Sequence, residues 1–91
     1  MTALQITISG RVQGVGFRYY ILRAAQELRI KGIIKNLPDG KVYIEAEGDP
    51  QNIEIFLEKC REGPPLAYVT HIHITECLPS GYNDFRVAYG Y

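Results

Sequence analysis

The spacing of hydrophobic residues switches between a strand period and a helix period along this chain. This order of periods restricts the possible folds more than any other feature of the sequence. Leu4, Ile6 and Ile8 alternate with polar residues, which predicts a half-buried strand. Residues 17–29 instead carry hydrophobic side chains at helical spacing, on one side of a predicted helix. A short glycine-containing loop separates the two segments, so a strand leads directly into a helix.

The rest of the chain repeats this change from strand pattern to helix pattern. The β-branched pair Ile33-Ile34 and an alternating run at residues 42–47 flank a Leu-Pro-Asp-Gly turn, which together predict a hairpin. Asp49-Pro50 combines an N-cap residue with a proline at the first helical position, and it predicts the start of a second helix. Gly63-Pro64-Pro65 predicts where this helix ends. Two more alternating segments follow, at residues 68–77 and 85–89.

The predicted order is therefore β-α-β-β-α-β with one short terminal strand. Each predicted strand has one apolar face and each predicted helix has one apolar stripe, so both helices should cover a single face of the sheet. We expect an α+β fold, a ferredoxin-like sandwich with two helices on one face of a mostly antiparallel sheet of four to five strands. A chain of 91 residues without repeats or linkers predicts a single domain over residues 1–91.

Charge and hydropathy argue against several classes of function. The chain has ten basic and ten acidic residues, so its net charge is zero, whereas nucleic-acid-binding domains usually carry a basic excess. No apolar run approaches the roughly 20 residues that span a bilayer, and the N-terminus has a strand pattern rather than a signal peptide. We expect a cytoplasmic monomer that binds neither nucleic acid nor membrane and in which Cys60 and Cys77 are free thiols.

The loop between the first strand and the first helix, GRVQGVGFR at residues 10–18, is the first candidate site. Its glycines allow a tight turn with backbone N–H groups directed into one concavity, and the helix N-terminus adds further unpaired N–H groups. Arg18 is unfavourable beside the positive end of the helix dipole unless both face a bound anion, and a guanidinium can grip two phosphate oxygens. The alternative is that the glycines only turn the chain and the Arg18 side chain extends into water.

Asn36, at the end of the second predicted strand, is the second candidate. Its amide both donates and accepts hydrogen bonds, which suits holding a water molecule against an electrophile. Taken alone, an asparagine beside a Pro-Asp-Gly turn more often belongs to the turn itself. The residue types at this position therefore favour the turn interpretation.

The remaining clusters of polar residues favour surface roles. His71 and His73 share a strand face, but no third metal ligand is evident, so we expect solvated histidines. Glu45 and Glu47 alternate along a strand and predict a solvated face rather than an acid–base pair. Tyr43 on an exposed sheet face would suit base stacking in RNA recognition, but the basic surroundings of such a surface are missing.

GRVQGVGFR, followed downstream by KNLPDGKVYIEAEG, closely resembles the acylphosphatase family, and the resemblance covers nearly the whole chain. Small acylphosphatases are single ferredoxin-like domains that hydrolyse the carboxyl–phosphate bond of acyl phosphates without metal or cofactor. The resemblance implies the same reaction here, with a small acyl phosphate as substrate and inorganic phosphate as product or inhibitor. A related domain begins the hydrogenase-maturation carbamoyltransferases, but a one-domain chain resembles the free-standing enzyme more closely.

The resemblance also assigns roles to particular positions. Arg18 matches the arginine that clamps the phosphate, and Asn36 matches the catalytic asparagine that orients the attacking water. This match overrides the turn interpretation of Asn36. The family's phosphate-binding loop, whose backbone N–H groups surround the phosphoryl oxygens, corresponds to Gln13, Gly14, Val15, Gly16 and Phe17.

The chain departs from the common family pattern at Arg29, where many members have glycine, and at Ile33-Ile34, where they have a tryptophan–valine pair. We interpret both as packing positions, so we expect altered stability or loop geometry rather than lost chemistry. The sequence also continues through Gly90-Tyr91, beyond the expected last strand.

Two other functions stay open from the sequence. One is a non-catalytic anion-binding module on the same fold, and the other is a single-strand RNA binder that uses Tyr43. The sequence does not reveal which acyl phosphate is the physiological substrate, because nothing in it reads as a dedicated acyl pocket.

Overall fold

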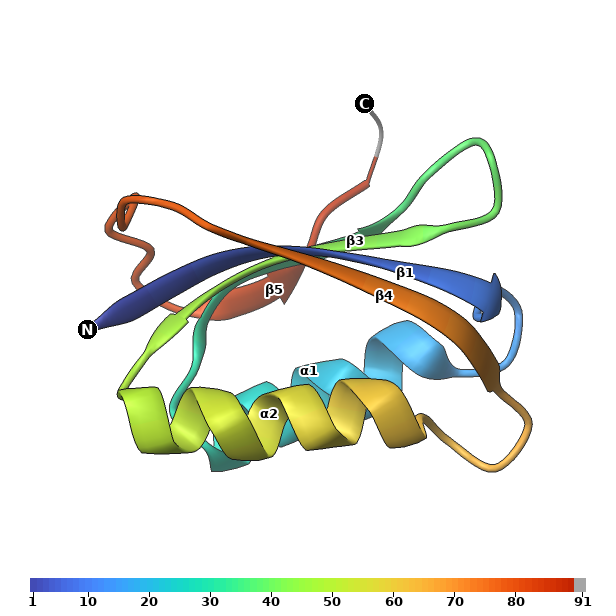
Figure 1. Cartoon of the computed structure of the whole chain (residues 1–91), viewed down its shortest axis with the longest axis horizontal. Coiled ribbons are helices and arrows are strands. Elements are labelled where there is room, and N and C mark those ends of the chain that lie inside the picture. The colour runs from blue at the N-terminus through green and yellow to red at the C-terminus, as the bar shows by residue number, and fades with distance from the viewer. Residues whose placement is uncertain (90–91) are drawn as a thin grey trace.

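A single sheet with two helices on one of its faces makes up the computed structural model of the chain, which describes residues 1–89 (Figure 1). Gly90 and Tyr91 lie outside the described residues. The strands are β1 (Thr2–Arg11), β2 (Lys31–Asn36), β3 (Val42–Gly48), β4 (Tyr68–Glu76) and β5 (Phe85–Val87). The helices are α1 (Phe17–Glu27) and α2 (Pro50–Glu62). This confirms the expected ferredoxin-like α+β sandwich.

The strand order in the sheet is β4-β1-β3-β2-β5. β1 pairs antiparallel with β3 and β4, β2 pairs antiparallel with β3, and β2 pairs parallel with the short β5. The parallel register continues past β5, where the Ala88 N–H donates a hydrogen bond of 2.8 Å to the Ile34 carbonyl. Because parallel strands end at the same edge of a sheet, the residues after β5 lie beside Asn36 at the end of β2.

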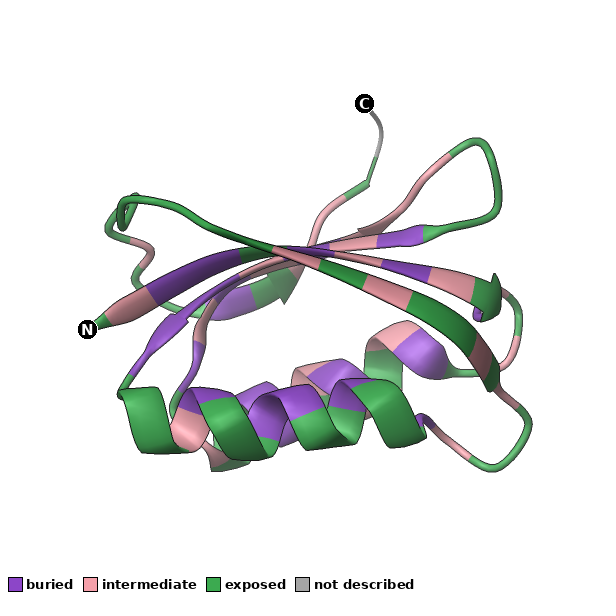
Figure 2. Ribbon diagram, in the orientation of Figure 1, coloured by how far each residue is buried: buried purple, intermediate pink, exposed green. Residues whose placement is uncertain are grey.

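The apolar stripes of the strands and helices meet between the two layers. Figure 2 shows buried residues on the sides of the helices that face the sheet. Phe56 of α2 packs edge-to-face against Phe85 of β5, with ring centroids 6.0 Å apart, an arrangement that aromatic pairs favour. Fully burying such a side chain typically stabilises a fold by about 1.5–3 kcal/mol. In the described part of the chain, neither helix has the length and hydrophobicity needed to cross a bilayer.

Both cysteines are free thiols, as expected. Cys60 is buried on the apolar stripe of α2, and this burial raises the pKa of its thiol to about 12. Cys77 is exposed just after β4.

The two ends of α2 are those that the sequence predicts. The Asp49 side chain accepts a hydrogen bond of 3.0 Å from the Gln51 N–H, and Pro50 occupies the first helical position. The helix ends at Gly63, whose φ of 69° lies in the left-handed region that favours glycine. A carboxylate at the N-cap satisfies one otherwise unpaired N–H group and also complements the helix dipole.

The end of α1 corrects the interpretation of Arg29 as a packing position. Arg29 is exposed, and its φ of 56° makes it the one non-glycine residue with positive φ among residues 1–89. The Ile30 N–H donates to the Ala25 carbonyl at 2.8 Å and the Arg29 N–H donates to the Gln26 carbonyl at 3.3 Å, which is a Schellman motif. Glycine is common at this position because it adopts the left-handed conformation without steric cost. Ile34, in contrast, is fully buried, so its packing role is confirmed. Ile33 is half-buried and is not among the residues that form or pack against the hydrophobic core.

The expectation of a solvated face at Glu47 is wrong. Its side chain is buried, with 4% of its surface exposed, because the segment between β4 and β5 returns across the sheet and covers it. The backbone N–H groups of Ser80, Gly81 and Tyr82 donate hydrogen bonds to the Glu47 carboxylate. A carboxylate that leaves water is stabilised when several N–H groups replace its hydration.

Glu45 and Tyr43 are also less exposed than expected. The half-buried Glu45 carboxylate accepts hydrogen bonds from the hydroxyls of Tyr43 and Tyr82. The ammonium of Lys35 lies 5.7 Å from the centre of the Tyr43 ring. The Tyr43 ring is therefore held by its neighbours and does not form the open stacking surface that RNA binding would require.

Candidate active site

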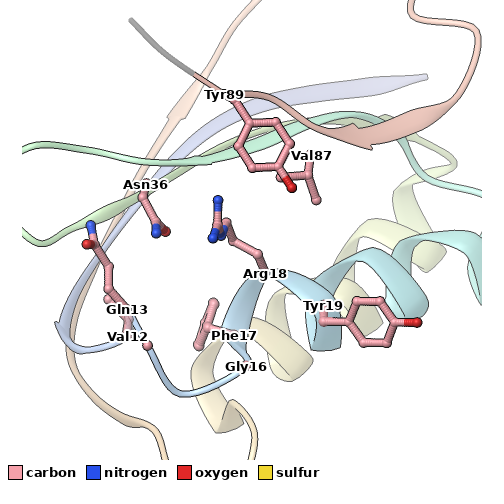
Figure 3. A pocket seen from close by; sticks show the side chains of 10 residues that line it. Val12, Gln13, Gly16, Phe17, Arg18, Tyr19, Asn36, Val87 and Tyr89 are labelled. Atoms are coloured by element: carbon pink, nitrogen blue, oxygen red, sulfur yellow. The ribbon is translucent and has the colours of Figure 1, made fainter.

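A cavity of about 210 Å³ opens where the loop after β1, the start of α1, the end of β2 and the segment after β5 meet (Figure 3). The residues that line it are Val12, Gln13, Gly14, Gly16, Phe17, Arg18, Tyr19, Asn36, Val87 and Tyr89. They come from segments far apart in the sequence, and the parallel pairing of β2 with β5 brings the last of them to the cavity.

The glycines of the loop provide its turns. Gly14 and Gly16 have φ values of 73° and 80°, in the left-handed region that glycine adopts without strain. Gly16 is the N-cap of α1, it offers no capping side chain, and the first turn of the helix contains no acidic residue. The first helical hydrogen bond runs from the Tyr20 N–H to the Gly16 carbonyl at 3.1 Å. The N–H groups that precede Tyr20 are therefore free of a helical partner and available to an anion.

Arg18 projects from the first turn of α1 into the cavity. Figure 3 shows its guanidinium directed into the space between Asn36 and Tyr89. The salt bridges among residues 1–89, Lys41–Asp39 and Arg86–Asp84, do not include Arg18. A cation and the positive end of a helix dipole thus face the same space, an arrangement that becomes favourable once an anion lies between them.

Asn36 supplies a buried hydrogen-bond acceptor without a partner. Its Oδ1 atom is buried and forms no hydrogen bond with any described residue. The following turn is held by the Leu37 N–H bonded to the Lys41 carbonyl at 2.8 Å and by the Lys41 N–H bonded to the Asp39 side chain at 3.1 Å. The Asn36 side chain therefore takes no part in the turn. An orphaned polar atom at a cavity wall typically marks the place of a water or ligand.

Gln13 connects the glycine loop to the turn after Asn36. Its Nε2 atom donates hydrogen bonds of 2.8 Å to the carbonyls of both Leu37 and Lys41. The sequence points only to its backbone N–H, and this role of its side chain was not predicted.

The cavity brings together most of the residues that the sequence singles out. Gln13, Gly14, Gly16, Phe17, Arg18 and Asn36 all line it. Val15 is the exception, because its half-buried side chain packs against the hydrophobic core. The lining residues that sequence reasoning missed are Val12, Tyr19, Val87 and Tyr89.

Tyr89 is the most informative of the missed residues. Its ring centre lies 5.5 Å from the guanidinium carbon of Arg18, within the range of a cation–π interaction. Only the parallel pairing of β5 with β2 brings this residue to the end of β2, and nothing near Tyr89 in the sequence signals that pairing.

The histidine pair forms no metal site within the described residues. His71 and His73 lie on the exposed side of β4. Among residues 1–89, no group of three or more His, Cys, Asp or Glu side chains is placed to hold a metal ion.

Comparison with known proteins assigns the chain to a family. The acylphosphatase family model matches residues 4–87. Acylphosphatase from Archaeoglobus fulgidus is 51% identical over 89 residues, which cover 98% of this chain and 100% of the relative. Acylphosphatase from Thermotoga maritima is 47% identical and covers 98% of this chain and 99% of its own length.

Solved structures give the same result. The crystal structure of acylphosphatase from Bacillus subtilis superposes with a TM-score of 0.95 at 39% identity, covering 98% of this chain and all of that chain. Full-length HypF in its phosphate- and nucleotide-bound form has a TM-score of 0.88 at 36% identity, covering 97% of this chain but 12% of HypF. The chain belongs to the acylphosphatase family, whose members are enzymes that hydrolyse acyl phosphates.

Proposed function

We propose that the loop amides and Arg18 hold the phosphoryl group of an acyl phosphate while Asn36 orients the attacking water. One observation carries this assignment: the unpartnered Oδ1 of Asn36 and the guanidinium of Arg18 belong to the same cavity of about 210 Å³. An acceptor for a water and a clamp for an anion are the two elements that hydrolysis of a phosphate anhydride needs.

The phosphoryl group would bind at the start of α1. Backbone N–H groups of residues 13–17 surround its oxygens, and the Arg18 guanidinium grips two of them. Phosphoryl transfer requires mainly positioning and charge stabilisation, and a protein nucleophile is not needed. Inorganic phosphate carries the same oxygens, so it should compete with the substrate for this cavity.

The attacking water would donate a hydrogen bond to Asn36 Oδ1 and direct its lone pair at phosphorus. The bond from the water oxygen to phosphorus forms while the bond from phosphorus to the carboxyl oxygen breaks. None of the ten lining residues is an aspartate, glutamate or histidine. The proton of the water therefore passes to a phosphoryl oxygen, and the carboxylate leaves as a stable anion that needs no general acid.

Hydrolysis of benzoyl phosphate in chelator-treated buffer tests the proposal. We expect turnover by the parent protein, competitive inhibition by inorganic phosphate, and a rate lowered on the order of 10²–10³-fold in Asn36→Ala, as for other preorganised hydrogen-bonding groups. Asn83→Ala is the matched control, because Asn83 is an exposed asparagine outside the cavity. A folded parent that binds phosphate but hydrolyses no acyl phosphate would instead indicate a non-catalytic anion-binding module.

A further inference from the structure

A second cavity, of about 320 Å³, adjoins the phosphate cavity and runs along α1. Gly16 and Tyr19 line both cavities, so the two spaces meet at the N-terminus of α1. We call the second cavity the α1–α2 groove, and its lining residues are Gly16, Tyr19, Tyr20, Arg23, Ala24, Glu27 and Lys59. The proposed hydrolysis of the carboxyl–phosphate bond involves none of the side chains that line this groove.

The groove follows one stripe of α1. Its residues recur at intervals of three and four, which places them on one side of the helix. Lys59 comes from α2, whose C-terminal end lies beside the N-terminal end of α1 (Figure 1). Arg23 is seven residues beyond Gly16, roughly 10 Å along the helix axis. Side chains on a helix lean toward its N-terminus, so the guanidinium of Arg23 can extend back toward the phosphate cavity.

The groove combines aromatic walls with unpaired positive charge. Tyr19 is 68% exposed, and Tyr20 is half-buried beside it. Neither Arg23 nor Lys59 forms a salt bridge with any described residue. The one carboxylate that lines the groove is Glu27, one turn beyond Arg23 and further from the phosphate cavity.

The in-line geometry of the proposed reaction places the acyl group of the substrate in this groove. In Figure 3, Asn36 and Tyr19 lie on opposite sides of Arg18. Phosphoryl transfer requires the attacking and leaving oxygens to be roughly in line across phosphorus. With the water at Asn36, the leaving carboxylate and the acyl group attached to it point toward Gly16 and Tyr19, where the groove begins.

We propose that the α1–α2 groove is the acyl subsite, and that Arg23 and Lys59 bind a second negative charge at the far end of the acyl group. The favoured substrates are then acyl phosphates of dicarboxylic or otherwise anionic acids rather than acyl phosphates of neutral ones. This inference rests on the proposed function of the adjoining phosphate cavity.

A pair of rigid substrates isolates the charge. 4-Carboxybenzoyl phosphate and 4-carbamoylbenzoyl phosphate have nearly the same shape, but only the first carries a distal anion. We expect the kcat/KM of the parent to be higher for 4-carboxybenzoyl phosphate than for the carbamoyl analogue, by on the order of three- to tenfold at low salt. The difference is modest because each exposed ion pair contributes little binding free energy. The ratio of the two kcat/KM values, carboxylate substrate over carbamoyl substrate, should fall toward one in Arg23→Gln, Lys59→Gln and the double variant. It should also fall toward one in the parent at high salt.

Two control variants separate the groove from the general charge of the protein. Arg61→Gln removes an exposed cation from α2 that does not line the groove, so the parent ratio should persist. Glu27→Gln removes the one carboxylate of the groove, so the ratio should rise. Equal kcat/KM values for both substrates, in the parent and in the double variant, would overturn the proposed acyl subsite. The proposed hydrolysis of acyl phosphates would not be affected by that result. No turnover of either substrate by the folded parent would overturn the proposed function, and the subsite with it.

Discussion

The side-chain amide of Gln13 donates a hydrogen bond of 2.8 Å to the backbone carbonyl of Leu37, the residue directly after Asn36. A second bond of 2.8 Å reaches the Lys41 carbonyl on the other side of the same turn. In the proposed mechanism, the loop that binds the phosphoryl group and the residue that orients the water belong to different elements, and the Gln13 side chain links them. We therefore expect Gln13 to help set the distance between the bound phosphoryl group and the water.

Replacing Gln13 with leucine should lower kcat by roughly 10–100-fold, because a displacement of about 1 Å between reacting groups can cost that much. The dissociation constant of inorganic phosphate should change much less, since the loop amides and Arg18 are still present. Steady-state kinetics with benzoyl phosphate and phosphate inhibition measure both values. Gln51→Leu, at an exposed position near the start of α2, should behave as the parent does. An unchanged kcat in Gln13→Leu would show that the link has no role in positioning.

Tyr89 should assist Arg18 through its ring rather than its hydroxyl. The ring centre lies 5.5 Å from the guanidinium carbon, and an exposed cation–π contact contributes about 0.5–1 kcal/mol. We expect Tyr89→Leu to weaken phosphate binding by roughly two- to fivefold, and Tyr89→Phe to retain the parent affinity. The inhibition constant of inorganic phosphate measures the effect. Equal losses in the leucine and phenylalanine variants would contradict a role for the ring.

Arg29 offers a stabilising substitution. Its φ of 56° is strained for a side chain with a Cβ atom but not for glycine. Arg29→Gly should therefore raise the free energy of unfolding by about 1 kcal/mol, measured by urea denaturation. Gln26→Gly, an exposed position within α1, should lower it by a similar amount because glycine is unfavourable in a helix. A destabilised Arg29→Gly variant would contradict the strain argument.

Glu47 should matter for stability and not for catalysis. Its buried carboxylate accepts three backbone N–H groups, and the amide of Glu47→Gln would direct its own N–H₂ group at some of these donors. We expect the free energy of unfolding to fall by about 1.5–3 kcal/mol, the usual range for hydrogen bonds to a charged group.

The position of Glu47 in the sheet explains why its catalytic effect should be absent. Asn36 pairs with Val42 at one end of β3, whereas Glu47 is five residues further along, roughly 16 Å away. The kcat of folded Glu47→Gln on benzoyl phosphate should therefore equal that of the parent. A large loss of kcat in a protein that remains folded at the assay temperature would contradict this separation.

The local parts of the fold follow from the sequence alone. Alternating residues predict β1, and Asp49-Pro50 together with Gly63 predict both ends of α2, because caps and periodicity act within a few residues. The candidate roles of Arg18 and Asn36 depend on the family resemblance as well. The residue type of Asn36 and its position beside a turn predict that its side chain forms hydrogen bonds within the turn. Only the structure shows that it takes no part in those hydrogen bonds.

The features that the sequence did not predict all depend on contacts between distant segments. Glu47 is buried because residues 80–82 return over it, and no periodicity within β3 can signal that cover. Tyr89 reaches Arg18 because β5 pairs in parallel with β2, and this pairing depends on the order of all the strands in the sheet. Arg29 has the left-handed conformation because the Schellman motif requires it there, against the preference of the residue itself.

The most direct test of the proposed roles of Arg18 and Asn36 is the dissociation constant of inorganic phosphate. Titration calorimetry measures it for the parent, Arg18→Ala and Asn36→Ala. We predict that Asn36→Ala binds phosphate about as tightly as the parent although its hydrolysis rate falls by on the order of 10²–10³-fold. Arg18→Ala should lose hydrolysis to at least the same extent and should also bind phosphate more than roughly tenfold more weakly. Phosphate binding by Arg18→Ala at the parent affinity would contradict the assignment of Arg18 as the clamp.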